Sequence, residues 1–233
     1  MRLQFAIKSG IERMGLSQRY YHARLQYSKS GDCLTHWNYE KNVIFIHIPK
    51  NAGTSVYSSM KVDTLPPDTH IPATVYRTTD PKLFESAYVF AYIRDPWDRF
   101  VSAFHYLKQG NHPNDKAMQE FLQPITDFSH FINELKNRPG FRATVMSWLH
   151  FLPQSYFLCD FSGRSLVQNL HRVENFNDGL DAVAQATGLN IIPQFENRSR
   201  RSDFREYYDV ESANLVHNLY RADIELLGYR PPK

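Results

Sequence analysis

Two short segments each place an apolar run directly before polar residues that can bind phosphate. In residues 43–55, VIFIHIPKNAGTS, a lysine, a glycine and two hydroxyl residues follow the run. In residues 92–104, YIRDPWDRFVSAF, an arginine follows the run, and a serine comes about two helical turns later. Where a strand turns into a helix, backbone N–H groups and the positive end of the helix dipole favour an anion. The two segments therefore predict the two halves of a nucleotide-binding edge, and hence an enzyme.

The first segment has the composition of a phosphate-binding turn. Gly53 would let the backbone approach an anion closely, and Lys50 would supply a mobile positive charge. This is not a Walker A loop, in which the lysine follows the glycines, because here the lysine comes first. The alternative is a plain junction between a strand and a helix with a solvated lysine. The residues expected to contact the phosphate are Lys50, Asn51, Ala52, Gly53, Thr54 and Ser55.

The second segment predicts a site for a terminal phosphate. Arg94 would stand at the carboxyl end of a strand, where ligands bind in open α/β sheets, and Ser102 would reach the same mouth. An arginine offers a planar fork that binds phosphate through two hydrogen bonds. In the alternative interpretation Asp95 caps the helix, Asp98 and Arg99 form surface pairs, and Ser102 is incidental. We assign Arg99 to that structural role.

The elements that must position these residues follow from the hydrophobic pattern. Residues 43–48 and 87–93 read as buried strands of a parallel sheet. Thr54 or Ser55 is expected to cap the first helix, and Asp95 with Pro96 is expected to start another. The helical patterns are residues 53–60, the segment from 96 onward, 116–122, 128–136, 178–187 and 210–227. Residues 63–81, with four prolines, predict a loop, and residues 156–159 and 166–170 are strand candidates.

Composition limits the class of protein. The 233 residues suffice for one α/β domain, predicted over residues 41–233, preceded by a helical or partly ordered arm over residues 1–40. The net charge of +3 gives no general basic field, so no nucleic-acid partner is expected. Cys33 and Cys159 fit no metal-binding spacing. No stretch of signal-peptide or membrane-spanning length is present in the sequence, which predicts a cytoplasmic protein.

In this order the two segments resemble the 5′-phosphosulfate loop and the 3′-phosphate motif of sulfotransferases that use 3′-phosphoadenosine 5′-phosphosulfate (PAPS). They are most similar to the carbohydrate sulfotransferases of the chondroitin and heparan 2-O group. Weaker similarities follow in order over roughly residues 42–230; they lie at His70, Pro153-Gln154, residues 173–175, 197–199 and 207–208, and 223–229. Animal members of this group carry a membrane anchor, whereas this sequence resembles a bacterial-type cytoplasmic member.

The resemblance implies a three-layer α/β/α fold with a central parallel sheet, similar to that of P-loop NTPases. It implies PAPS as sulfuryl donor and a hydroxyl acceptor on a carbohydrate or glycan. No metal is expected, since sulfuryl transfer depends on positioning and charge stabilisation. Lys50 would stabilise the departing 5′-phosphate, and Arg94 with Ser102 would bind the 3′-phosphate. His70 is the expected general base, because histidine suits proton transfer near neutral pH.

Some roles stay open at the level of sequence. Arg198 and Ser199 belong to a basic cluster that either closes over the 3′-phosphate, meets an anionic glycan, or is a solvated loop. Gln154 either orients a loop or acceptor or has a purely structural role. His47 is expected to be a buried structural histidine. The alternative functions are a P-loop-type nucleotide kinase or NTPase, and a non-catalytic module that binds a nucleotide or glycan. The sequence does not define the acceptor or the oligomeric state.

Overall fold

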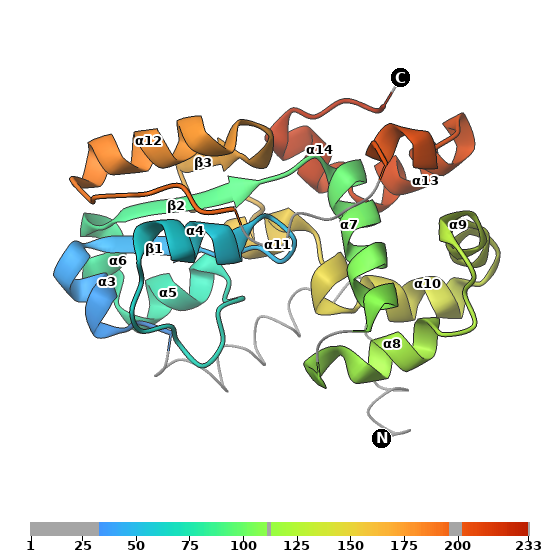
Figure 1. The fold of residues 1–233 in the computed structure, drawn as a ribbon, viewed down its shortest axis with the longest axis horizontal. Coiled ribbons are helices and arrows are strands. Elements are labelled where there is room, and N and C mark those ends of the chain that lie inside the picture. Colours follow the sequence, from blue (N-terminus) through green and yellow to red (C-terminus); the bar gives the residue numbers. More distant parts are fainter. Residues whose placement is uncertain (1–32, 111–112, 196–201, 233) are drawn as a thin grey trace. The chain divides into compact units, whose positions relative to one another are not determined.

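The computed structural model describes residues 33–110, 113–195 and 202–232, which group into two compact units (Figure 1). The sheet unit contains residues 33–94 and 154–195 of the described chain, and the helical unit contains residues 95–110, 113–153 and 202–232. Each unit is described by itself below.

The sheet unit is built on three parallel strands in the order β1-β2-β3. These are β1 (Val43–Ile46), β2 (Tyr88–Ile93) and β3 (Asn169–Arg172). In the register of the sheet, Val43 pairs with Tyr88 and Phe90 pairs with Asn169. Every residue of β1 is buried, and so is all of β2 after its first residue, which is the pattern of strands covered on both faces. The first two strands are where the sequence predicts them.

The helices of the sheet unit surround this sheet. One core cluster joins Phe45, Phe90 and Tyr92 of the strands to Val56 of α4 and Leu180 of α12. Figure 1 shows α12 running along β2 and β3, with which it is in contact. The helices are α3 (His36–Lys41), α4 (Gly53–Met60), α5 (Ala73–Thr79), α6 (Pro81–Ser86), α11 (Gln154–Leu158) and α12 (Phe176–Thr187), with the 3₁₀ turn η3 (Val173–Asn175).

Three segments of the sheet unit differ from the sequence prediction. The third strand covers Asn169–Arg172, so it overlaps the candidate strand over residues 166–170 only in its first two residues. Residues 63–81 are not one loop, because Pro72 precedes α5 and Pro81 is the first residue of α6, positions where proline does not interrupt a helix. Residues 156–159 do not form a strand: residues 154–158 are the short helix α11, and every one of them is buried. A short apolar run that is buried all round has no periodicity that separates the two states.

The helical unit begins with the predicted start of α7 (Pro96–Gln109). The Asp95 carboxylate accepts hydrogen bonds from the N–H groups of Trp97 and Asp98, and Pro96 occupies the first helical position. The other elements are α8 (Lys116–Leu122), α9 (Phe128–Asn137), α10 (Pro139–Met146), α13 (Val210–Leu219) and α14 (Arg221–Leu227). The 3₁₀ turns are η1 (Pro113–Asp115), η2 (Leu149–Phe151) and η4 (Phe204–Tyr207).

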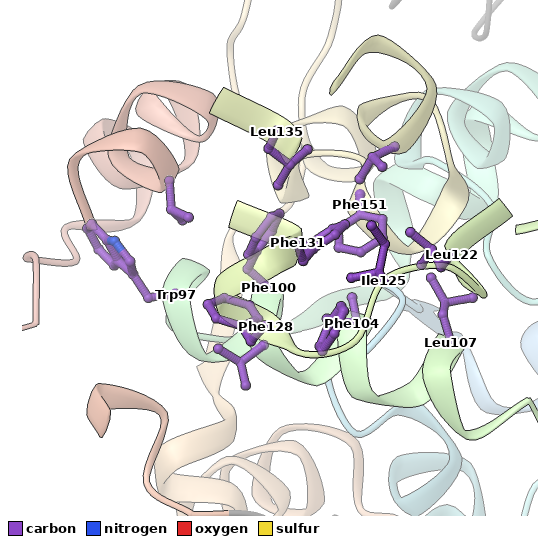
Figure 2. Close-up of a cluster of buried hydrophobic side chains, with 14 of the residues drawn as sticks. Trp97, Phe100, Phe104, Leu107, Leu122, Ile125, Phe128, Phe131, Leu135 and Phe151 are labelled. Atoms are coloured by element: carbon purple, nitrogen blue, oxygen red, sulfur yellow. The ribbon is translucent and has the colours of Figure 1, made fainter. Parts of the chain in front are cut away.

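Aromatic side chains fill the core of the helical unit (Figure 2). Phe100 stacks on Phe131 with ring centroids 5.6 Å apart, and it meets Phe151 edge-on at 5.2 Å. Such offset and edge-to-face arrangements are the favoured geometries of aromatic pairs. The predicted core positions Phe100, Val101, Phe104 and Leu107 are all buried here.

The predicted helix over residues 210–227 is two helices that are separated at Tyr220. The Tyr220 hydroxyl donates a 2.7 Å hydrogen bond to the carbonyl of Phe151, and the side chain is buried. No proline or glycine marks this break, so it depends on a partner that is distant in the sequence.

The fold class is confirmed: the described chain is an α/β structure with a parallel sheet. Within the predicted arm, α3 occupies the last residues, and residues 1–32 lie outside the described part of the chain. The prediction of one sulfotransferase-type domain over residues 41–233 stays a prediction.

Candidate active site

A tight turn of residues 49–52, here called the Lys50 turn, connects β1 to α4. Lys50 and Ala52 both adopt the left-handed conformation, with φ of 69° and 59°. Non-glycine residues rarely adopt this conformation, and residues held in it cluster at functional sites. The Lys50 turn therefore has the compact, strained backbone of an anion-binding turn ahead of a helix.

The start of α4 differs from the expectation. Ala52 is the N-cap residue, and no side chain caps the helix, so the prediction of a Thr54 or Ser55 cap is wrong. Because the helix already begins at Gly53, both residues lie within its first turn. A helix has no internal acceptors for its first N–H groups. Together with the helix dipole, these donors make the start of α4 suitable for a phosphate.

Asn51 holds the Lys50 turn to the end of β2. It is almost fully buried, and its Nδ2 donates 2.7 Å hydrogen bonds to the carbonyl of Tyr92 and to Oε1 of Gln154. Gln154 Oε1 also accepts from the N–H of Arg94 at 3.0 Å, and Gln154 Nε2 donates to the Arg94 carbonyl at 2.7 Å. We call these four residues the Gln154 network. It joins the ends of β1 and β2 through the first residue of α11.

Arg94 lies where the sequence predicts it, directly after β2. Its Nη1 donates a 2.9 Å hydrogen bond to the carbonyl of Lys50. The guanidinium of the second motif therefore touches the turn of the first motif, within one compact unit. The structure brings together Lys50, Asn51 and Arg94 of the predicted site residues.

Gly53 has a structural reason in addition to the predicted one, which stays a prediction. A Cβ atom built at Gly53 would lie 1.8 Å from Nε2 of His47. A close approach to an imidazole of the same unit thus also requires glycine here. His47 is 8% exposed, and its ring packs against the rings of Phe45 and Tyr57, with centroid distances of 5.6 and 5.4 Å. Burial raises the pKa of Tyr57, so its hydroxyl stays neutral.

His70, the expected base, is close to this group. Its Nδ1 lies 3.2 Å from the carbonyl oxygen of His47, and the two ring centroids are 4.2 Å apart. The N–H of His70 donates to the Asp68 carboxylate at 2.9 Å. His70 is half-buried, and through His47 it is linked to Gly53 at the start of α4.

The remaining predicted residues lie outside the sheet unit or outside the described chain. Ser102 is 6% exposed in α7 of the helical unit, which is described separately. Arg198 and Ser199 lie outside the described residues.

The prediction that Arg99 forms a surface pair is wrong, because its side chain is only 1% exposed. Burial raises the pKa of Tyr220, an effect that the Arg99 guanidinium opposes. The same interior holds Asp223, which is fully buried. The structural role of Arg99 is thus that of a buried cation within the helical unit.

Comparison with known proteins gives the reaction class. A family model described as "Sulfotransferase family" matches residues 36–230. The chain belongs to the sulfotransferase family. The comparisons found no match among curated proteins and none among solved structures. A sulfotransferase moves a sulfuryl group to an acceptor, so this chain is a transferase of that class and its acceptor carries a hydroxyl group.

Sequence reasoning left the role of Gln154 open in this sulfotransferase and named none of its hydrogen-bond partners. Its position after Pro153 matches a landmark of the family. The sequence does not show which residues it binds, because its hydrogen bonds reach residues about sixty and about one hundred positions away. It also missed the role of the Asn51 side chain, because Asn51 was expected only to contact the phosphate. A buried amide with several donors and acceptors is a common link between loops, but sequence alone does not show burial.

The described residues contain no group of three or more His, Cys, Asp or Glu side chains that could hold a metal ion. None of the described helices of the sulfotransferase is long and apolar enough to span a membrane.

Proposed function

We propose that this sulfotransferase transfers the sulfuryl group of PAPS to a hydroxyl group of a carbohydrate. The observation that carries the proposal is the contact between Arg94 and the carbonyl of Lys50. It places the cation of the second motif against the turn of the first, so that one nucleotide with phosphates at two positions can contact both. The strained Lys50 turn and the uncapped start of α4 support a phosphate site there.

In the proposed reaction the acceptor oxygen forms a bond to sulfur while the bond from sulfur to the 5′-phosphate oxygen breaks. The electron pair of the broken bond stays on the phosphate. Lys50 stabilises the negative charge that develops there, and backbone N–H groups of residues 51–55 hold the phosphate. Such a displacement depends on orientation and charge, which this chain's own residues supply.

His70 is the proposed general base, and it takes the proton of the acceptor hydroxyl. The position of His70 supports this role, because His70 lies beside His47, whose ring packs on the first residue of α4. A base must come within hydrogen-bond reach of the proton that it removes. Arg94 with Ser102, and Arg198 with Ser199, are the proposed ligands of the 3′-phosphate.

The test is calorimetric binding of adenosine 3′,5′-bisphosphate, the product of the donor. We expect the wild type to bind it, and Lys50→Ala and Arg94→Ala each to weaken binding about ten- to hundredfold, as for a lost charged hydrogen bond. Lys82→Ala, an exposed lysine of α6, is the matched control and should bind like the wild type. Absence of binding by the wild type contradicts the proposal.

The acceptor is tested by transfer of labelled sulfate from PAPS to a panel of glycans, lipids and small alcohols. Transfer to a glycan supports the carbohydrate assignment, and transfer only to a lipid or a small alcohol contradicts it. Magnesium-dependent turnover of ATP would instead favour a kinase or NTPase.

A further inference from the structure

The two histidines of the sheet unit are in direct contact. His47 directly follows β1, and His70 lies in the connection before α5. Their ring centroids are 4.2 Å apart at an angle of 51°, and Nδ1 of His70 lies 3.2 Å from the His47 carbonyl oxygen. This second contact constrains the protons on the His70 ring.

A backbone carbonyl can only accept a hydrogen bond. The nitrogen that faces it must therefore carry the proton, which places that proton on Nδ1 of His70. A neutral imidazole has one N–H group, so its basic lone pair is then on Nε2. The contact with His47 thus selects which His70 nitrogen can accept a proton.

The His47 ring has little freedom to move. It is 8% exposed, it stacks on Phe45 and it meets Tyr57 edge-on. The ring also fills the space beside Gly53, because a Cβ atom built at Gly53 would lie only 1.8 Å from Nε2 of His47. In a close-packed interior such a ring keeps one orientation. Because Gly53 begins α4, the His47 ring contacts both the proposed phosphate site and the proposed base.

We propose that His47 is a positioning residue for sulfuryl transfer. Its carbonyl holds His70 in the tautomer protonated on Nδ1, and its ring fixes the orientation of the His70 ring, so that Nε2 of His70 takes the proton from the acceptor hydroxyl. This inference rests on the proposed function. It also explains why residue 53 is glycine, since the space of its side chain is filled by His47.

The first test needs no activity. Long-range proton–nitrogen correlation spectra of the ¹⁵N-labelled full chain report the tautomer of each neutral histidine, and His70→Gln identifies the signals of His70. We expect the proton on Nδ1. A His70 ring protonated only on Nε2 overturns the proposal, whatever the enzyme binds.

The second test uses a pair of substitutions. Gly53→Ala should lower the melting temperature strongly, because its Cβ collides with the His47 ring. Adding His47→Ala removes that ring, so the double variant should melt at a higher temperature than Gly53→Ala alone. If the two losses simply add, the His47 ring does not explain Gly53 and the packing part of the proposal fails.

The third test separates positioning from donor binding. His47→Ala should lower kcat by about tenfold or more while the affinity for adenosine 3′,5′-bisphosphate stays close to that of the wild type. His36→Ala, at an exposed histidine of α3, is the control. An unchanged kcat overturns the proposal. Absence of bisphosphate binding by the wild type contradicts the proposed function instead, and the tautomer result is independent of it.

Discussion

Gln154 binds both backbone groups of Arg94, since its Oε1 accepts from the Arg94 N–H and its Nε2 donates to the Arg94 carbonyl. This pairing continues the hydrogen bonding of β2 one residue beyond the end of the strand at Ile93. The same Oε1 accepts from Asn51 in the Lys50 turn. One buried amide therefore holds Arg94 next to the Lys50 turn, although Arg94 and Lys50 are 44 positions apart in the sequence.

Substitution of Gln154 by Glu should destabilise the fold. The carboxylate keeps the acceptor for Asn51 but loses the donor to the Arg94 carbonyl, and it introduces a charge at a side chain that is 0% exposed. We expect a loss of about 2–4 kcal/mol in the free energy of unfolding at neutral pH. Urea unfolding measures it, and Gln185→Glu on the exposed side of α12 is the control that should change little. Equal stability of the two variants contradicts the Gln154 network.

Asn51→Asp should also lower the free energy of unfolding, for a related reason. The Asn51 Nδ2 donates to two acceptors, the Tyr92 carbonyl and Gln154 Oε1, and an aspartate would face both of them without a proton. An unsatisfied buried charge costs more than the roughly 1–3 kcal/mol of a neutral group. We expect the free energy of unfolding to fall by at least about 3 kcal/mol, as measured by chemical denaturation. Asn190→Asp, at an exposed asparagine of the same unit, should unfold at nearly the wild-type midpoint.

Lys61→Gly should stabilise the chain. Lys61 is exposed at the end of α4 with φ of 53°, a conformation that glycine adopts without strain. We expect a gain of about 0.5–1 kcal/mol, observed as a higher melting temperature. Ala186→Gly, in the right-handed backbone of α12, should instead lower the stability by about the same amount. A loss at both positions would show that Lys61 does not have the left-handed conformation in solution.

Tyr106 should make stability depend on alkaline pH. Burial, together with the adjacent Asp115 carboxylate, raises the pKa of Tyr106 from 10.0 to about 12. The folded state therefore keeps the proton longer than the unfolded state, and this contribution to stability is full below about pH 10 and is lost as pH rises to about 12. Urea unfolding across this range measures the decline. Tyr106→Phe should weaken the dependence, and an identical dependence would contradict the assignment to Tyr106.

The predictable parts of the fold are those with local causes. Continuous apolar runs give β1 and β2, and Asp95 with Pro96 gives the start of α7, since a capping carboxylate bonds to N–H groups two and three residues ahead. Residues 156–159 were predicted as a strand and form part of the helix α11 and its end, because total burial removes the periodicity on which such a prediction depends.

By itself the sequence determined the two phosphate-type motifs, the α/β class and the sulfotransferase family, because each depends on the residue types and spacing of short segments. Only the tertiary structure decided that Gly53 accommodates the His47 ring, that Gln154 ties Asn51 to Arg94, and that Arg99 is buried. The physical reason is the same in each case. Burial and close packing depend on partners far away in the chain, whereas caps, turns and strands depend on neighbours.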